Sequence, residues 1–116
     1  MSKKVAKEYL KHIFDEICFV LDKRKDYDED RFMNDEVVKR AFVRSLEVIG
    51  EAVKNIDEDF KDNYRGINWK SLAGLRDKLI HHYFGVDYQI VWDVIENELP
   101  EIKMRIGEIL GKWVVY

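Results

Sequence analysis

One short segment of the chain holds most of the side chains that could act on a phosphate, namely Arg76, Asp77, His81, His82 and Tyr83. An arginine binds two phosphate oxygens at once and keeps its charge at any working pH. An imidazole can take or give a proton near neutral pH. Together they could cleave RNA without a metal ion. The imidazole would remove the proton of a ribose 2′-hydroxyl, the oxygen would attack the adjacent phosphate, and the arginine would stabilise the added negative charge.

The spacing of these residues on a regular helix predicts which of them can meet. Asp77 and His81 are four residues apart, so they are neighbours, and the carboxylate could orient the imidazole. Arg76 and Tyr83 are seven apart and share a face. Arg76 and His81 are separated by roughly 140° around a regular helix. They converge only if Arg76 reaches around, the helix distorts, or a second subunit supplies one of the two groups.

Two other interpretations of this segment stay open. In the first, the protein is a module that binds a nucleotide or another protein without cutting anything. In the second, it is a structural bundle in which Arg76 and His81 only pair with neighbours, as exposed charged residues usually do. A metal site is a weaker interpretation, because His81 and His82 are adjacent and point in different directions, and no Cys or His cluster accompanies them. We therefore expect no metal and no other cofactor.

Apolar residues recur at helical spacing along most of the chain, which predicts four or five helices. The first is expected over residues 4–21, and the charged stretch 22–31 is expected to be a connection. Asn34 or Asp35 can cap the second helix. Its buried side is predicted to consist of Val38, Phe42, Ser45, Ile49, Ala52 and Ile56.

The third helix is expected to begin near Trp69 and to continue through Tyr83, with Leu72, Leu75 and Leu79 on its inner face. Gly85 ends it or bends the chain just past it. Asp87 can cap the next helix, and Pro100 predicts a kink or the start of a further helix. No hairpin pattern is expected. Trp69, Trp92 and Trp113 are predicted to belong to the core or to an interface.

Gly50 on the second expected helix suggests how that helix meets the third. A glycine inside a helix costs stability, so we expect it to allow the close approach of another helix. Glu51, beside it in the sequence, could then reach the third helix and hold Arg76. Glu51 is therefore a candidate supporting residue of the site, together with Asp77.

The composition places limits on the class of protein. The chain has 116 residues and is 47% hydrophobic, which fits a single folded domain over residues 1–116 with its own core. Its single cysteine and the lack of a long apolar run suggest a cytoplasmic protein with no membrane span. The formal net charge of −3 argues against a broad basic surface for nucleic acid. If RNA is the substrate, the positive potential must be local.

At this point the motifs resemble those of a known family, the HepT-like proteins of the HEPN superfamily. Similarity extends from about Tyr9 to about Leu110. The residues that carry it are Arg76, His81, Tyr83, Phe84-Gly85-Val86-Asp87, Val91-Trp92, Trp69 and the stretch Arg44-Ser45-Leu46-Glu47-Val48-Ile49-Gly50-Glu51-Ala52.

The resemblance implies an all-α, up-and-down bundle of four or five helices that pairs as a homodimer and brings two copies of the motif into one cleft. It implies an endoribonuclease with Arg76 and His81 as the catalytic pair, acting as the toxin of a toxin–antitoxin system. The antitoxin would be an MntA-type nucleotidyltransferase that silences the toxin by transferring AMP to Tyr83. An assembly larger than a dimer could form with that partner. His82 occupies a variable position of the motif and is given no role.

Overall fold

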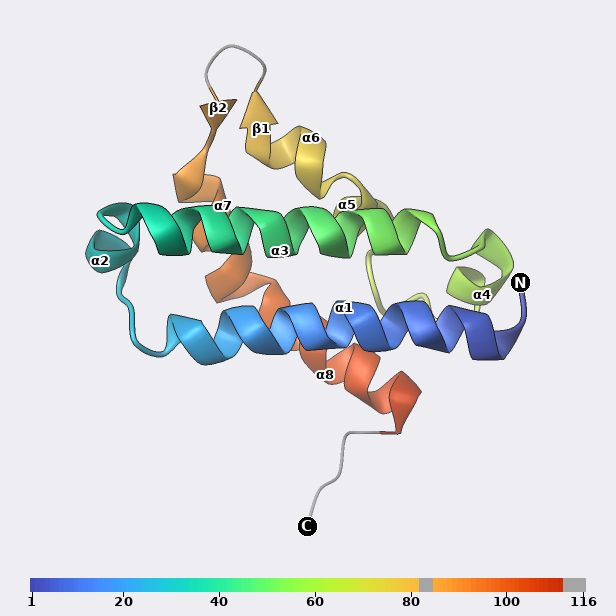
Figure 1. Ribbon diagram of the computed structural model, residues 1–116. Helices are drawn as coiled ribbons and strands as arrows, with labels where there is room; N and C mark the ends of the chain where they lie inside the picture. The colour runs from blue at the N-terminus through green and yellow to red at the C-terminus, as the bar shows by residue number, and fades with distance from the viewer. Residues whose placement is uncertain (82–84, 112–116) are drawn as a thin grey trace.

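A computed structural model describes residues 1–81 and 85–111 of the chain (Figure 1). Within these ranges there are eight helices and one two-stranded antiparallel hairpin, which confirms the all-α class. The four long helices are α1 (Lys3–Arg24), α3 (Glu36–Lys54), α7 (Tyr88–Asn97) and α8 (Leu99–Leu110). The shorter elements are α2 (Glu29–Met33), α4 (Glu58–Asp62), α5 (Trp69–Ala73), α6 (Leu75–Leu79), β1 (Ile80–His81) and β2 (Gly85–Val86).

The long helices form two layers with the core between them. Helices α1 and α3 lie side by side, and α7 and α8 cross behind them (Figure 1). Helix α1 packs against both α3 and α8, while α5 and α6 pack against α3. The hairpin projects from the far side of α3, away from α1 (Figure 1). None of the helices in the described part of the chain is long and apolar enough to cross a membrane.

Side-chain caps fix the starts of two of the long helices, as the sequence predicts. The Asp35 carboxylate accepts a hydrogen bond from the main-chain N–H of Val38 at 3.0 Å and so caps α3. This bond, followed by the one from the Tyr27 hydroxyl, lowers the pKa of Asp35. Asp87 caps α7 in the same way, through the main-chain N–H of Ile90 at 3.2 Å. Pro100 lies in the first turn of α8, where its missing N–H costs nothing.

An aromatic cluster joins the two layers of the core. Phe32 and Phe42 are fully buried and stack with ring centroids 5.7 Å apart. Phe32 also contacts the ring of Trp92 at 5.1 Å, which ties α2 to α7. Trp69 and Trp92 are each only 9% exposed, which confirms their predicted place in the core. Trp113 lies outside the described residues.

The structure differs from the sequence predictions at the end of the first helix, in the charged connection and along the third helix. Helix α1 continues to Arg24, and the charged connection contains the short helix α2. The third helix is not continuous, because it is divided at Gly74 into α5 and α6. It also ends at Leu79 rather than near Tyr83, and an unexpected hairpin follows. Glycine weakens a helix by about 1 kcal/mol, and the β-branched and aromatic residues after Leu79 favour extended backbone.

Candidate functional site

His81 lies on a hairpin rather than on a helix. In the hairpin Ile80 pairs with Val86 and His81 pairs with Gly85. The base of the hairpin is closed by the main-chain N–H of Asp87, which donates to the carbonyl of Leu79 at 2.8 Å. Successive side chains of a strand point to opposite faces. Ile80 is accordingly half-buried against the core and His81 is exposed.

Gly85 provides a backbone conformation that the hairpin requires. Its φ of 70° lies in the left-handed region, which costs a residue with a Cβ atom and costs glycine little. The sequence prediction that Gly85 bends the chain is confirmed. The bend returns the chain to the bundle, where α7 begins.

Arg76 lies on α6, one helical turn before the hairpin. Leu75 and Leu79 anchor this short helix, with 1% and 0% of their surfaces exposed. The side chain of Arg76 is 64% exposed, and its Nε lies 3.9 Å from Oε2 of Glu47 on α3. Glu47 is the more buried partner, with a side chain that is 24% exposed. The guanidinium is therefore held loosely at one edge while most of it faces solvent.

Glu47, and not the predicted Glu51, is the carboxylate of α3 that pairs with Arg76. The side chain of Glu51 is 60% exposed and pairs with Lys54 at 3.4 Å, so the predicted contact between Glu51 and Arg76 is wrong. Geometry on the helix explains the difference. Glu47 is three residues from Gly50 and about 60° away around the helix, whereas Glu51 is adjacent and about 100° away. Helical spacing counted from Gly50 could therefore have identified Glu47.

Gly50 lies close to α5, the first part of the third predicted helix, as expected from the sequence. A Cβ atom added there would lie 3.1 Å from the carbonyl oxygen of Leu72 on α5. Real Cβ atoms rarely come so near to a backbone oxygen, so glycine permits the spacing of the two helices. This spacing places Glu47, one turn earlier on α3, within reach of Arg76 on α6.

The end of α6 changes the relation between Arg76 and His81. Because the helix stops at Leu79, the separation of roughly 140° expected on a regular helix does not apply. Three helical steps and two extended steps place the two Cα atoms at most about 12 Å apart. A distortion of the helix, one of the three ways in which Arg76 and His81 could approach each other, is therefore present. The expected contact between Asp77 and His81 is wrong, because it needs a continuous helix, and neither side chain forms a hydrogen bond or ion pair within the described residues.

Tyr83 and His82 lie outside the described residues, since the structure describes 1–81 and 85–111. The role predicted for Tyr83 therefore remains a prediction. In the sequence it follows β1 and precedes β2.

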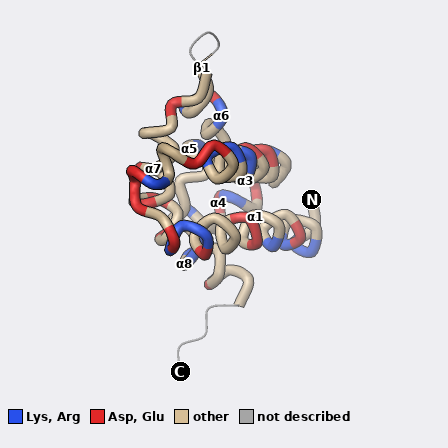
Figure 2. The backbone as a smooth tube through the Cα atoms, turned by 60° about the vertical axis from the view of Figure 1, so that its left-hand side comes forward, with Lys and Arg blue, Asp and Glu red and all other residues tan. Residues whose placement is uncertain are grey.

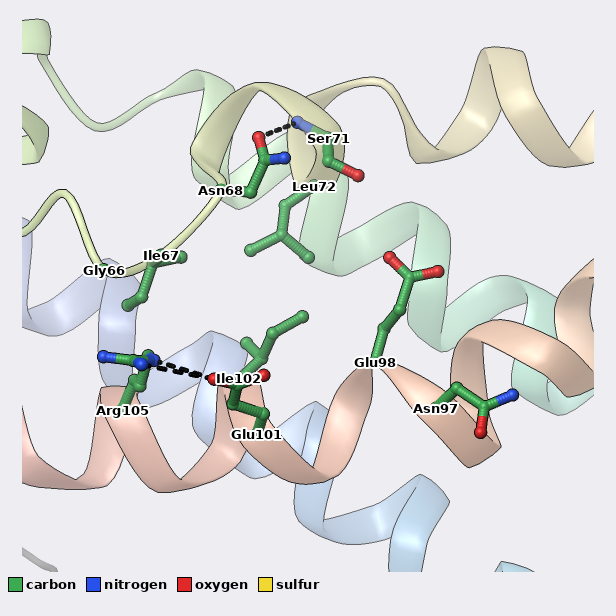
Figure 3. Close-up of a pocket in the computed structure, with 10 residues that line it drawn as sticks. All are labelled: Gly66, Ile67, Asn68, Ser71, Leu72, Asn97, Glu98, Glu101, Ile102 and Arg105. Atoms are coloured by element: carbon green, nitrogen blue, oxygen red, sulfur yellow. Dashed lines mark hydrogen bonds and ion pairs between the residues drawn. The ribbon is translucent and has the colours of Figure 1, made fainter.

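A pocket of about 180 Å³ lies between α5 and α8 (Figure 3). Leu72 and Ile102 contribute apolar surface, and Arg105 closes one end through an ion pair with Glu101 at 3.2 Å. At the other end Glu98 pairs with Lys78 of α6 at 3.3 Å. The pocket contains neither Arg76 nor His81, so the exposed motif residues belong to an open surface rather than to this cavity.

A helical bundle with an exposed arginine in the first turn of α6 and an exposed histidine on the following strand defines a class of protein, and its family can be named. The family model described as "Ribonuclease HepT-like" matches residues 6–109. The chain belongs to the HepT-like ribonuclease family, which confirms the resemblance read from the motifs.

Several curated relatives are similar over almost their full length. A protein of Caldanaerobacter subterraneus subsp. tengcongensis named "Putative RNase" is 48% identical over 94% of this chain and 97% of its own. A Methanocaldococcus jannaschii protein with the same name is 46% identical over 95% of this chain and 91% of its own. A "Probable ribonuclease HepT" of Thermococcus cleftensis is 39% identical over 92% of this chain and 97% of its own. No solved structure matches significantly.

Proposed function

We propose that this protein is a metal-independent endoribonuclease in which Arg76 and His81 are the catalytic residues. The observation that carries the proposal is the placement of an exposed guanidinium on α6 and an exposed imidazole on β1, separated by four residues of which Leu79 is buried and Ile80 half-buried. A fixed cation and a group that titrates near neutral pH are what phosphodiester cleavage by a ribose hydroxyl requires. The names of the relatives support the same reaction class.

In the proposed reaction the enzyme accepts one proton from the 2′-hydroxyl and donates one proton to the leaving 5′-oxygen. The His81 imidazole takes the proton of the 2′-hydroxyl, and the 2′-oxygen forms a bond to the adjacent phosphorus. Arg76 stabilises the negative charge that accumulates on the phosphoryl oxygens. The bond from phosphorus to the 5′-oxygen then breaks, and that oxygen leaves with a proton from an imidazole. The products are a 2′,3′-cyclic phosphate and a free 5′-hydroxyl.

A homodimer would supply the second imidazole and a second guanidinium. One copy of His81 would act as the base and the other as the acid, so neither would have to serve twice within one turnover. Two copies of Arg76 would also double the local positive charge of a protein whose net charge is −3. Sedimentation of the purified protein tests the dimer directly.

The chemistry predicts a dependence on the ribose 2′-hydroxyl. An RNA cut at a defined position should resist cleavage there when that one nucleotide carries 2′-deoxyribose, because the attacking oxygen is missing. Cleavage elsewhere in the same molecule serves as the internal control. Electrophoresis of end-labelled RNA measures both, and cleavage of the unmodified RNA should persist in EDTA. Cutting at the deoxy position would rule out this mechanism.

The binding-module alternative has its own signature. Nucleotide binding by calorimetry, together with intact RNA after incubation with clean wild-type protein, would favour a module that holds a ligand without cutting it.

Glu47 is expected to contribute to the rate by holding Arg76 in position. The change Glu47→Gln keeps the shape of the side chain and removes its charge, so kcat should fall by about twofold to fivefold, the range of an exposed ion pair. KM should not rise, because the freed guanidinium still binds phosphate. Glu51→Gln is the matched control on the same face of α3 and should leave kcat unchanged, because Glu51 pairs with Lys54. An equal fall in both variants would contradict a specific role for Glu47.

We further propose that the protein is a toxin controlled by a nucleotidyltransferase of the MntA type, with Tyr83 as the modified residue. An AMP group on Tyr83 would add negative charge and bulk close in sequence to His81, and would compete with the RNA phosphate. Incubation with the partner enzyme and ATP should add the mass of AMP to the wild-type protein and not to Tyr83→Phe. Loss of RNA cleavage should follow the modification. Modification with unchanged cleavage would contradict this control.

A further inference from the structure

We propose that Arg40 and Arg44, on the exposed face of α3, bind the phosphates of the RNA strand that flank the phosphate being cleaved. The inference rests on the proposed ribonuclease function and adds the surface that positions the substrate. It also answers a question posed by the composition, namely how an acidic protein could hold a polyanion.

The two arginines differ from the other cations of α3 because their side chains form no ion pair with any described residue. Both are exposed, and within the described residues neither side chain takes part in a hydrogen bond, an ion pair or a ring contact. On the same helix Lys39 pairs with Glu36 at 2.8 Å and Lys54 pairs with Glu51 at 3.4 Å. Arg40 and Arg44 are therefore the basic residues of α3 that form no ion pair among the described residues.

The position of the arginines on the helix directs them toward the site. Arg44 is three residues and Arg40 seven residues before Glu47, which places them about 60° and 20° from it around the helix. Glu47 is the residue that contacts Arg76. The two arginines therefore continue from the ion pair toward the start of α3, and the hairpin stands over this half of the helix (Figure 1).

The spacing of the two arginines suits a strand of RNA. Four residues of helix span about 6 Å, so the two guanidinium groups are far enough apart to bind separate phosphates. The ion pairs of the nearby carboxylates are formed with other cations: Glu36 pairs with Lys39 and Glu47 with Arg76, while Arg40 adds a smaller charge interaction that lowers the pKa of Glu36. Asp77, the exposed carboxylate next to Arg76 in the sequence, lies on α6 rather than on α3. Figure 2 shows basic residues on α3, interspersed with acidic ones, and further basic residues on α6 above it.

The test measures how RNA binding depends on salt. A His81→Ala background prevents cleavage, and binding of a fluorescent 12-nucleotide single-stranded RNA is followed by anisotropy from 50 to 300 mM KCl. Each phosphate contact contributes about 0.7 to the slope of log K against log salt for a single strand. Arg40→Gln/Arg44→Gln should therefore lower the magnitude of the slope by about 1.4 and weaken binding by tens of fold at the lowest salt.

A matched control removes the same charge elsewhere. Lys4 and Lys7 are exposed residues on α1, the helix on the other side of α3 from the hairpin (Figure 1). Lys4→Gln/Lys7→Gln should leave the slope as in the background protein. An equal fall in slope for both pairs would mean a general charge effect and would overturn the proposal. An unchanged slope for the arginine pair would overturn it as well.

Two further readouts separate this inference from the proposed function. With His81 intact, kcat/KM of the arginine pair variant should fall at least tenfold more for the 12-nucleotide RNA than for a dinucleoside monophosphate, which has no flanking phosphate. If wild-type protein cuts neither substrate, the proposed function fails, while the binding slope still measures the arginines. A change in sedimentation of the variant would place Arg40 and Arg44 in a protein interface and overturn the proposal.

Discussion

Replacing Arg76 or His81 with alanine is expected to abolish measurable RNA cleavage while leaving the fold intact. Loss of a general base lowers rates by about 10²–10⁴, and loss of a group that stabilises transition-state charge lowers them by about 10²–10³. Both side chains are exposed, and neither contributes to the core, so the free energy of unfolding should change by less than about 0.5 kcal/mol. Initial rates on end-labelled RNA and urea denaturation measure the two quantities.

Matched controls exist for both substitutions. His12 is an exposed histidine on α1, and Arg65 is an arginine between α4 and α5 whose side chain lies at the surface. His12→Ala and Arg65→Ala should cleave RNA like the wild type. Because the two catalytic groups act in one step, the double variant Arg76→Ala/His81→Ala should be little slower than the worse single variant. Single variants that retain a tenth of the wild-type rate would remove these residues from the chemistry.

Replacing Phe42 with alanine is expected to have the largest effect on stability. Its ring is fully buried, stacks on Phe32 at 5.7 Å and contacts Phe19 at 6.5 Å, so it joins α3 to both α2 and α1. Removing a buried phenyl ring costs about 3–5 kcal/mol, through lost burial and the cavity that remains. The total stability of such a domain is about 5–15 kcal/mol. The urea midpoint should therefore fall steeply.

Phe19 provides the comparison for this variant, because it is the same residue type and is 50% exposed. Phe19→Ala should cost about 1 kcal/mol, in proportion to the smaller area that it buries. Phe42→Ala should also retain cleavage at temperatures where it is folded, because the ring is buried in the core whereas Arg76 and His81 are exposed. Equal losses of stability in the two variants would contradict the position of Phe42 at the centre of the core.

The sequence alone was sufficient for features that depend on residues close together in the chain. The cap at Asp35, the cap at Asp87 and the helix start at Pro100 follow from side-chain chemistry within one helical turn. The inner face of the third helix also follows, since Leu72, Leu75 and Leu79 are all buried. The choice of Arg76 and His81 as candidate catalytic residues needs only their chemical types and their spacing along the chain.

The tertiary structure decided how those motif residues are presented. Whether residues 80 and 81 are helical or extended depended on the pairing of β1 with β2. This pairing supplies backbone hydrogen bonds in place of those that a longer α6 would have formed. The choice of Glu47 over Glu51 as the partner of Arg76 depended on how closely α5 approaches Gly50. Propensity along the chain is a weak effect of less than about 1 kcal/mol per residue, and contacts between distant segments override it. The sequence therefore determined which groups form the candidate site, and packing determined the backbone on which they lie and the partner that Arg76 meets.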